Sequence, residues 1–105
     1  MSDRKRRRLL LADNLAEYRR SVRGFLVLEA FTIDEAGTPE EAIEMLERRE
    51  YDLVLVDLRM RDDEDTDDIS GFEIAQFAQA CGIRCIIVTA FPTVELARKA
   101  LRARG

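Results

Sequence analysis

The sequence contains an apolar run, Leu53-Val54-Leu55-Val56, that ends on the carboxylate of Asp57. Four consecutive apolar residues lack the alternation of a strand with one wet face, so the run predicts a central parallel strand covered on both sides. The carboxyl ends of such strands form the edge at which open α/β sheets bind their ligands. Asp57 is therefore the first candidate site residue, although an aspartate in this place can also simply begin a turn.

Polar residues close two other apolar runs in the same way. Asp13 and Asn14 follow the run of residues 9–12, and Thr89 follows the last apolar run of the chain. If the first and third strands are neighbours where the winding of the sheet reverses, Asp13, Asn14 and Asp57 converge in one crevice. Thr89 then arrives from the adjacent strand. Polar residues at three strand exits favour a site over three unrelated turns.

The elements that must position these residues alternate along the chain. Strands are predicted over residues 8–12, 31–36, 53–57 and 84–89, and helices over residues 15–30, 39–50, 71–81 and 93–102. With right-handed crossovers, this alternation predicts a parallel sheet with helices on both faces. The whole chain, residues 1–105, is expected to form one domain.

Local patterns support two of the helices. The apolar side of the first helix is predicted from five positions that recur at helical spacing, Leu15, Tyr18, Val22, Phe25 and Leu26. Thr38 precedes the second helix as its cap, and Glu41 stands three residues later, which is the spacing of a capping box.

Composition excludes several classes of protein. The net charge of −4 argues against a whole surface built for nucleic acid, and no apolar run approaches the roughly 20 residues needed to cross a bilayer. A cytoplasmic protein without membrane contact is expected. Cys81 and Cys85 occur in a chain without histidine, so the usual zinc ligand sets are excluded, and two buried thiols are expected rather than a disulfide.

Several motifs in the right order resemble the receiver domain of two-component response regulators. The matching segments are Leu9-Leu10-Leu11-Ala12-Asp13-Asn14, Asp52-Leu53-Val54-Leu55-Val56-Asp57-Leu58-Arg59-Met60, Ser70-Gly71-Phe72-Glu73 and Ile86-Ile87-Val88-Thr89-Ala90. The resemblance implies a flavodoxin-like α/β fold with an open parallel sheet of four strands in the order 2-1-3-4 and helices on both faces. It further implies that Asp57 takes a phosphoryl group. It also implies that Asp13, Asn14, Asp57 and the carbonyl of Arg59 hold Mg²⁺, and that Thr89-Ala90 forms the switch that contacts the phosphate.

The sequence departs from this family at several places. Asn14 replaces the usual second acid of the acidic pair, Arg61 replaces the usual proline, and the family's fifth strand, its lysine and its last helix have no counterpart. A neutral amide should weaken metal binding, since Mg²⁺ prefers carboxylates.

An acidic loop with six acids in the seven residues 62–68 precedes the third helix. A solvated surface loop is the first expectation. The alternative is that one of its carboxylates leans over the site and replaces the charge missing at Asn14. A calcium loop is not expected, because Asp68 occupies its glycine position and Ile74 its glutamate position.

We therefore expect a phosphoacceptor receiver domain that is not an enzyme, with a sensor histidine kinase or a phosphotransfer protein as partner. Nucleic acid is not an expected partner of this domain. Two alternatives remain open. One is a pseudo-receiver that serves as a phosphorylation-independent interaction module, and the other is a nucleotide binder, against which the lack of a Gly-rich loop counts. The flat apolar edge of the last strand also predicts a homodimer, with the contact near Ile86, Val88, Val94 and Leu101.

Overall fold

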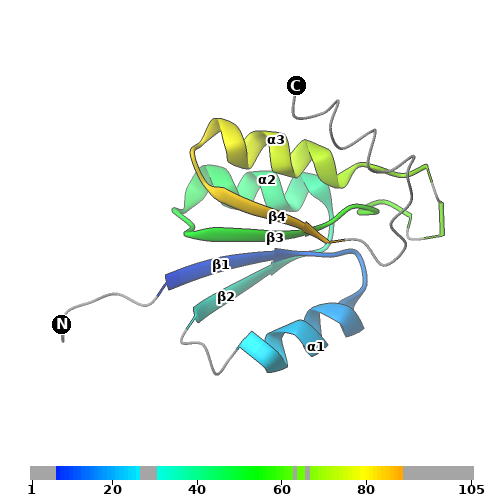
Figure 1. The fold of residues 1–105 in the computed structure, drawn as a ribbon, viewed down its shortest axis with the longest axis horizontal. Helices are drawn as coiled ribbons and strands as arrows, with labels where there is room; N and C mark the ends of the chain where they lie inside the picture. The colour runs from blue at the N-terminus through cyan, green and yellow to red at the C-terminus, as the bar shows by residue number, and fades with distance from the viewer. Residues whose placement is uncertain (1–6, 27–30, 63, 66, 89–105) are drawn as a thin grey trace.

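The computed structural model describes residues 7–26, 31–62, 64, 65 and 67–88, which form a parallel sheet in the order β2-β1-β3-β4 (Figure 1). The described elements are β1 (Arg7–Ala12), α1 (Ala16–Leu26), β2 (Phe31–Ala36), α2 (Pro39–Arg48), β3 (Leu53–Asp57), α3 (Gly71–Ala80) and β4 (Arg84–Val88). The predicted topology is confirmed. The helix predicted over residues 93–102 lies outside the described residues. Within the described part, no helix has the length and apolar character to cross a membrane.

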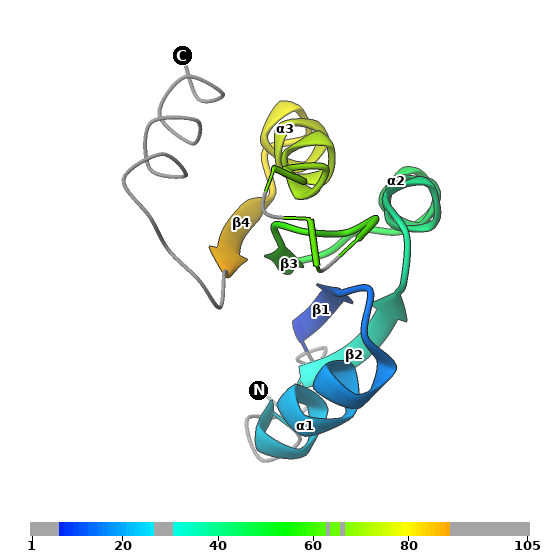
Figure 2. The ribbon, with the colours of Figure 1, turned by 90° about the vertical axis from the view of Figure 1, so that its right-hand side faces the viewer.

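Helices cover both faces of the sheet, with α1 on one side and α2 and α3 on the other (Figure 2). Alternate residues of β1 pack on opposite faces of the sheet. Leu9 and Leu11 pack with α1, whereas Leu10 and Ala12 belong to the larger hydrophobic cluster with α2 and α3. All four side chains are at most 4% exposed. This double coverage explains why β1 is a continuous apolar run instead of an alternating one.

The start of α2 has the predicted capping arrangement. Thr38 Oγ1 accepts a hydrogen bond of 3.1 Å from the backbone N–H of Glu41. The Glu41 carboxylate reaches back to the backbone N–H of Gly37 at 2.7 Å, one residue before the position that a capping box normally uses. Two backbone donors at this helix start are therefore satisfied by side chains.

The buried stripe of α1 begins one turn later than the sequence predicts. Val22 and Leu26 pack against the sheet, but Tyr18 is 53% exposed. The prediction of a buried Tyr18 was wrong, because helical spacing identifies a face but not how far along the helix the sheet extends.

The two thiols are free, as expected, but only one of them is shielded. Cys85 is half-buried in β4, and burial raises its pKa to about 11. Cys81 is exposed, because it follows the last turn of α3 next to Gly82, whose φ of 75° turns the chain toward β4. The expectation that Cys81 is buried was therefore wrong.

Candidate functional site

Asp57 lies at the carboxyl end of β3 and is half-buried. Burial, followed by the negative charge of Asp13, raises the pKa of its carboxyl group from 3.8 to about 6. Hydrogen bonds from the backbone of Arg59 and Leu58, together with the charge of Arg59, act in the opposite direction. The charge of Asp13 thus opposes the ionisation of Asp57 in a partly dehydrated site, where a bound cation would relieve the repulsion.

The sheet brings Asp13 to this place through the register of β1 and β3. Ala12 pairs with Val56, so the next residue of each strand, Asp13 and Asp57, leaves the sheet at the same edge. The backbone N–H of Asp13 donates to the carbonyl of Ala36 at 3.0 Å, and its Oδ1 accepts from the N–H of Leu15 at 3.0 Å. Through these two hydrogen bonds, Asp13 connects the carboxyl end of β1 to the last residue of β2 and to the segment just before α1.

The residues around the two carboxylates fit a magnesium ion. The side chain oxygen of Asn14 and the Nε of Arg59 are shielded from solvent, and Arg59 as a whole is 8% exposed. Mg²⁺ is commonly bound by one or two carboxylates, with waters and carbonyl oxygens completing an octahedron. In the described part of the chain, no group of three or more acidic, histidine or cysteine residues could hold a metal. Asp13, Asp57 and Asn14 supply oxygen donors, which suit a hard cation such as Mg²⁺.

Gly71 sets how closely α3 approaches Asp57. Its N–H donates to the carbonyl of Leu58 at 2.8 Å. A Cβ atom at Gly71 would lie 2.2 Å from the carbonyl oxygen of Asp57 and 2.9 Å from Leu58 Cα, distances that no real side chain tolerates. Phe72, the next residue, packs on Leu58. The helix start thus lies directly against the segment that carries the candidate phosphoacceptor.

The acidic loop folds locally around one of its own carboxylates. Asp68 accepts hydrogen bonds from the backbone N–H groups of Arg61 at 2.9 Å, Asp62 at 2.7 Å and Ser70 at 2.9 Å. Burial acts to raise the pKa of Asp68, but these hydrogen bonds lower it below its ordinary value. The expected solvated loop is correct for the exposed Asp62 and its exposed neighbours, but Asp68 organises the loop. The alternative that a carboxylate of this loop replaces the charge missing at Asn14 stays a prediction.

The sequence reasoning missed the role of Arg61. Its guanidinium binds Glu40 of α2 at 2.7 Å and Glu73 of α3 at 3.2 Å. The hydrogen bonds and charge of Glu40 raise the pKa of Arg61, although burial opposes the shift. The sequence did carry one signal for this role, because Arg61 stands where the receiver family usually has a proline. Its partners lie 21 and 12 residues away, so their identity could not be inferred from the sequence.

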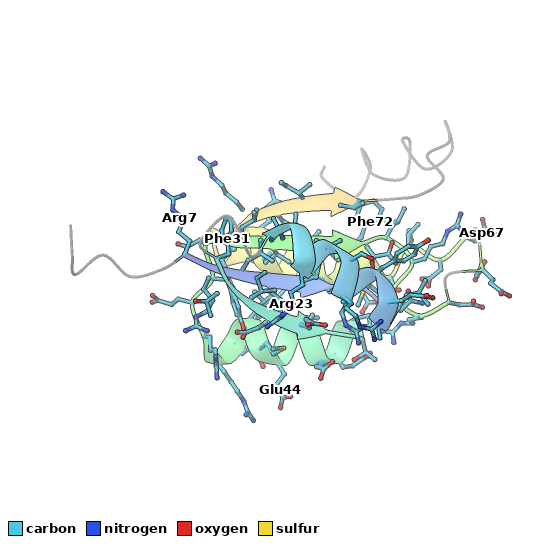
Figure 3. The ribbon with its side chains drawn as sticks, turned by 90° about the horizontal axis from the view of Figure 1, so that it is seen from below. Arg7, Arg23, Phe31, Glu44, Asp67 and Phe72 are labelled. Carbon is cyan, nitrogen blue, oxygen red and sulfur yellow. The ribbon has the colours of Figure 1, made fainter. Side chains whose placement is uncertain are left out.

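The structure brings part of the predicted site together. Asp13 and Asn14 follow the carboxyl end of β1, and Asp57 and Arg59 lie at or just after the carboxyl end of β3. Figure 3 shows Asp67 of the acidic loop at one end of the molecule and Arg7 at the opposite end. Thr89, Ala90, Val94 and Leu101 lie outside the described residues. Ile86 and Val88 lie on β4 and are 51% and 52% exposed.

Comparison with known proteins gives a consistent result. The family model of the response regulator receiver domain matches residues 9–105. The alginate biosynthesis transcriptional regulatory protein AlgB of Pseudomonas aeruginosa is 31% identical over 99 residues, which are 94% of this chain and 21% of that protein. This chain thus spans about a fifth of the length of that relative.

Solved structures share the fold. A response regulator receiver protein from Pseudomonas putida has a TM-score of 0.75 at 22% identity, covering 95% of this chain and 81% of that one. A CheY-like receiver domain protein from Methanospirillum hungatei has a TM-score of 0.76 at 23% identity, covering 94% and 76%.

Proposed function

The chain belongs to the response regulator receiver domain family, and on this premise we propose that Asp57 accepts a phosphoryl group from a protein of a two-component system. The donor is a sensor histidine kinase or a phosphotransfer protein. The observation that carries the proposal is the half-buried Asp57 carboxylate beside Asp13, with its pKa raised to about 6. We also propose that residues 1–105 form a single receiver domain.

The chemistry is a transfer between nucleophiles. A carboxylate oxygen of Asp57 forms a bond to phosphorus while the bond from phosphorus to the donor breaks, and the donor atom keeps the electron pair and takes up a proton. The raised pKa of Asp57 marks a carboxylate that is poorly solvated, and a poorly solvated anion is a better nucleophile than one fully hydrated in water.

Magnesium is the proposed cofactor of this reaction. Asp13, Asp57, Asn14 and the backbone carbonyl of Arg59 would hold it. When bound, the ion offsets the repulsion between the anionic carboxylates and the anionic phosphoryl group. With Asn14 in place of an acid, the site has one charged ligand fewer than the family pattern, so we expect weak binding.

Phosphorylation with a small-molecule donor tests the assignment. The protein is incubated with Mg²⁺ and acetyl phosphate, and intact mass spectrometry measures the adduct. Asp57→Asn should abolish the adduct. The matched control is Asp52→Asn, because Asp52 is an exposed aspartate just before the opposite end of β3, where its Oδ2 accepts from the N–H of Arg8 at 2.7 Å. An adduct that survives Asp57→Asn contradicts the proposal.

The same experiment distinguishes a phosphoacceptor receiver from the alternative, a pseudo-receiver that does not accept phosphate. A pseudo-receiver would give no adduct in the wild-type protein at any Mg²⁺ concentration. Asn14 is the residue that favours this alternative. Asn14→Asp should therefore strengthen Mg²⁺ binding and increase the adduct if the phosphoacceptor proposal is correct, because a carboxylate is the better ligand for a hard cation.

The homodimer stays a prediction. Ile86 and Val88 are exposed on β4, which pairs only with β3 among the described strands. An exposed apolar edge strand is suited to pairing with another strand. Light scattering after size exclusion at micromolar concentration tests the association, and a monomer would contradict it.

A further inference from the structure

Arg19 connects the candidate site to the neighbouring strand. This residue of α1 donates from Nη1 to the backbone carbonyl of Asp13 and from Nε to Glu35 Oε1 of β2 at 3.0 Å. The arginine side chain is 19% exposed and that of Glu35 33% exposed. The guanidinium is therefore partly shielded from water, which strengthens both interactions relative to an exposed pair.

The neighbouring turn leaves room for this guanidinium. A Cβ atom at Gly37 would lie 3.3 Å from Arg19 Nη1, which is tighter than an ordinary contact. Gly37 itself donates to Glu41 at the start of α2. Arg19 thus binds the β1–α1 connection and lies close to the β2–α2 turn.

Asp13 is held through both of its backbone polar groups. Its N–H donates to the carbonyl of Ala36, and its carbonyl accepts from Arg19. These two bonds fix the peptide planes on either side of the Asp13 Cα, and hence the direction in which its carboxylate leaves the chain. Groups that orient a metal ligand in this indirect way often control metal affinity.

We propose that Arg19 is a positioning residue of the phosphoacceptor site, with Glu35 holding its guanidinium on the carbonyl of Asp13. The inference rests on the proposed function and deepens it, because it identifies a residue that orients Asp13 for the cation without binding the cation itself. Loss of Arg19 should therefore affect Mg²⁺ binding and phosphorylation beyond its effect on stability.

The chain supplies a matched control in Arg23, one turn further along α1. Its Nη1 donates to Glu35 Oε2 at 2.9 Å and to the carbonyl of Ile33 at 3.1 Å. Arg19 and Arg23 thus share the carboxylate of Glu35, and each also binds one backbone carbonyl. They differ in which carbonyl they bind, since only Arg19 binds Asp13. A purely structural role for both residues would make their substitutions equivalent.

The experiment compares Arg19→Gln, Arg19→Lys and Arg23→Gln with the wild type. Isothermal titration calorimetry measures the Mg²⁺ affinity, and urea denaturation measures the free energy of unfolding. Arg19→Gln should bind Mg²⁺ about 10-fold more weakly, at the lower end of the losses seen when a group orienting a metal ligand is removed. Arg23→Gln should keep the wild-type affinity even if it loses similar stability. Arg19→Lys should recover part of the affinity.

A spectroscopic measurement keeps the test valid if Arg19→Gln is unstable. The backbone carbonyl ¹³C resonance of Asp13 should shift in Arg19→Lys, because an ammonium group replaces the guanidinium donor, and should stay in place in Arg23→Gln. Equal Mg²⁺ affinity in Arg19→Gln and wild type, or equal losses in Arg19→Gln and Arg23→Gln, would overturn the inference. A wild-type protein that neither binds Mg²⁺ nor accepts phosphate would instead overturn the proposed function.

Discussion

Replacing Gly71 with alanine should destabilise the protein at the point where α3 meets the site. The new Cβ would lie 2.2 Å from the carbonyl oxygen of Asp57, so the helix start must retreat by about 1.2 Å to reach ordinary contact distance. That movement would stretch the Gly71–Leu58 hydrogen bond, now 2.8 Å, to about 4 Å, which is beyond hydrogen-bonding range.

The magnitude follows from three contributions. Overpacking costs about 1–3 kcal/mol, and loss of the hydrogen bond costs about 1 kcal/mol. The higher helix propensity of alanine returns up to about 1 kcal/mol. We therefore expect the free energy of unfolding to fall by about 2 kcal/mol, which for a domain of this size lowers Tm by roughly 10 °C.

Urea denaturation followed by far-ultraviolet circular dichroism measures this change. Gly24→Ala is the control, because Gly24 lies in α1 and a Cβ atom there would have no neighbour within 4 Å. The same substitution should stabilise the protein by about 0.5–1 kcal/mol at Gly24. If Gly71→Ala is as stable as the wild type, or is stabilised like Gly24→Ala, the close approach of α3 to Asp57 is refuted.

Three further substitutions test other contacts. The pKa of Asp57 rises from an ordinary 3.8 to about 6 on folding, so its ionisation penalises the fold above pH 4, and increasingly up to pH 6. This penalty is at most about 3 kcal/mol, or about 1 kcal/mol for a half-exposed group. In buffer with a chelator, Asp57→Asn should be more stable than the wild type at pH 7 but not at pH 4 in urea denaturation, and an equal difference at both pH values would contradict the pKa shift. Thr38→Ala should cost about 1 kcal/mol, because the N–H of Glu41 loses its cap, and unchanged urea stability would count against the cap. Burial raises the pKa of Tyr51 to about 12, helped by its hydrogen bond of 2.7 Å to Asp34, so Tyr51→Phe should remove a tyrosinate transition near pH 12 in an ultraviolet titration, and its persistence would argue against this contact.

The sequence by itself determined the sheet and the location of the candidate site. The strands are short runs of mainly apolar residues, and the helices have apolar positions at helical spacing, so the local pattern was enough to predict a parallel sheet covered by helices. The strand order came from the resemblance to the receiver domain. Asp13 and Asp57 follow two of these runs directly. Because parallel strands end at a common edge, their convergence follows once β1 and β3 are neighbours.

Only the tertiary structure decided which residues form hydrogen bonds and ion pairs with the long arginine side chains. The sequence did not identify the partners of Arg19, Arg23 and Arg61. In the structure, Arg19 binds Glu35 and the carbonyl of Asp13, Arg23 binds Glu35, and Arg61 binds acids of α2 and α3. The exposure of Tyr18 was settled in the same way, by how far the sheet extends along α1. The spacing of buried apolar residues depends on residues that are close together in the chain, so it can be read from the sequence. An arginine reaches any carboxylate or carbonyl that the fold brings within range, so its partner is set by three-dimensional distance alone.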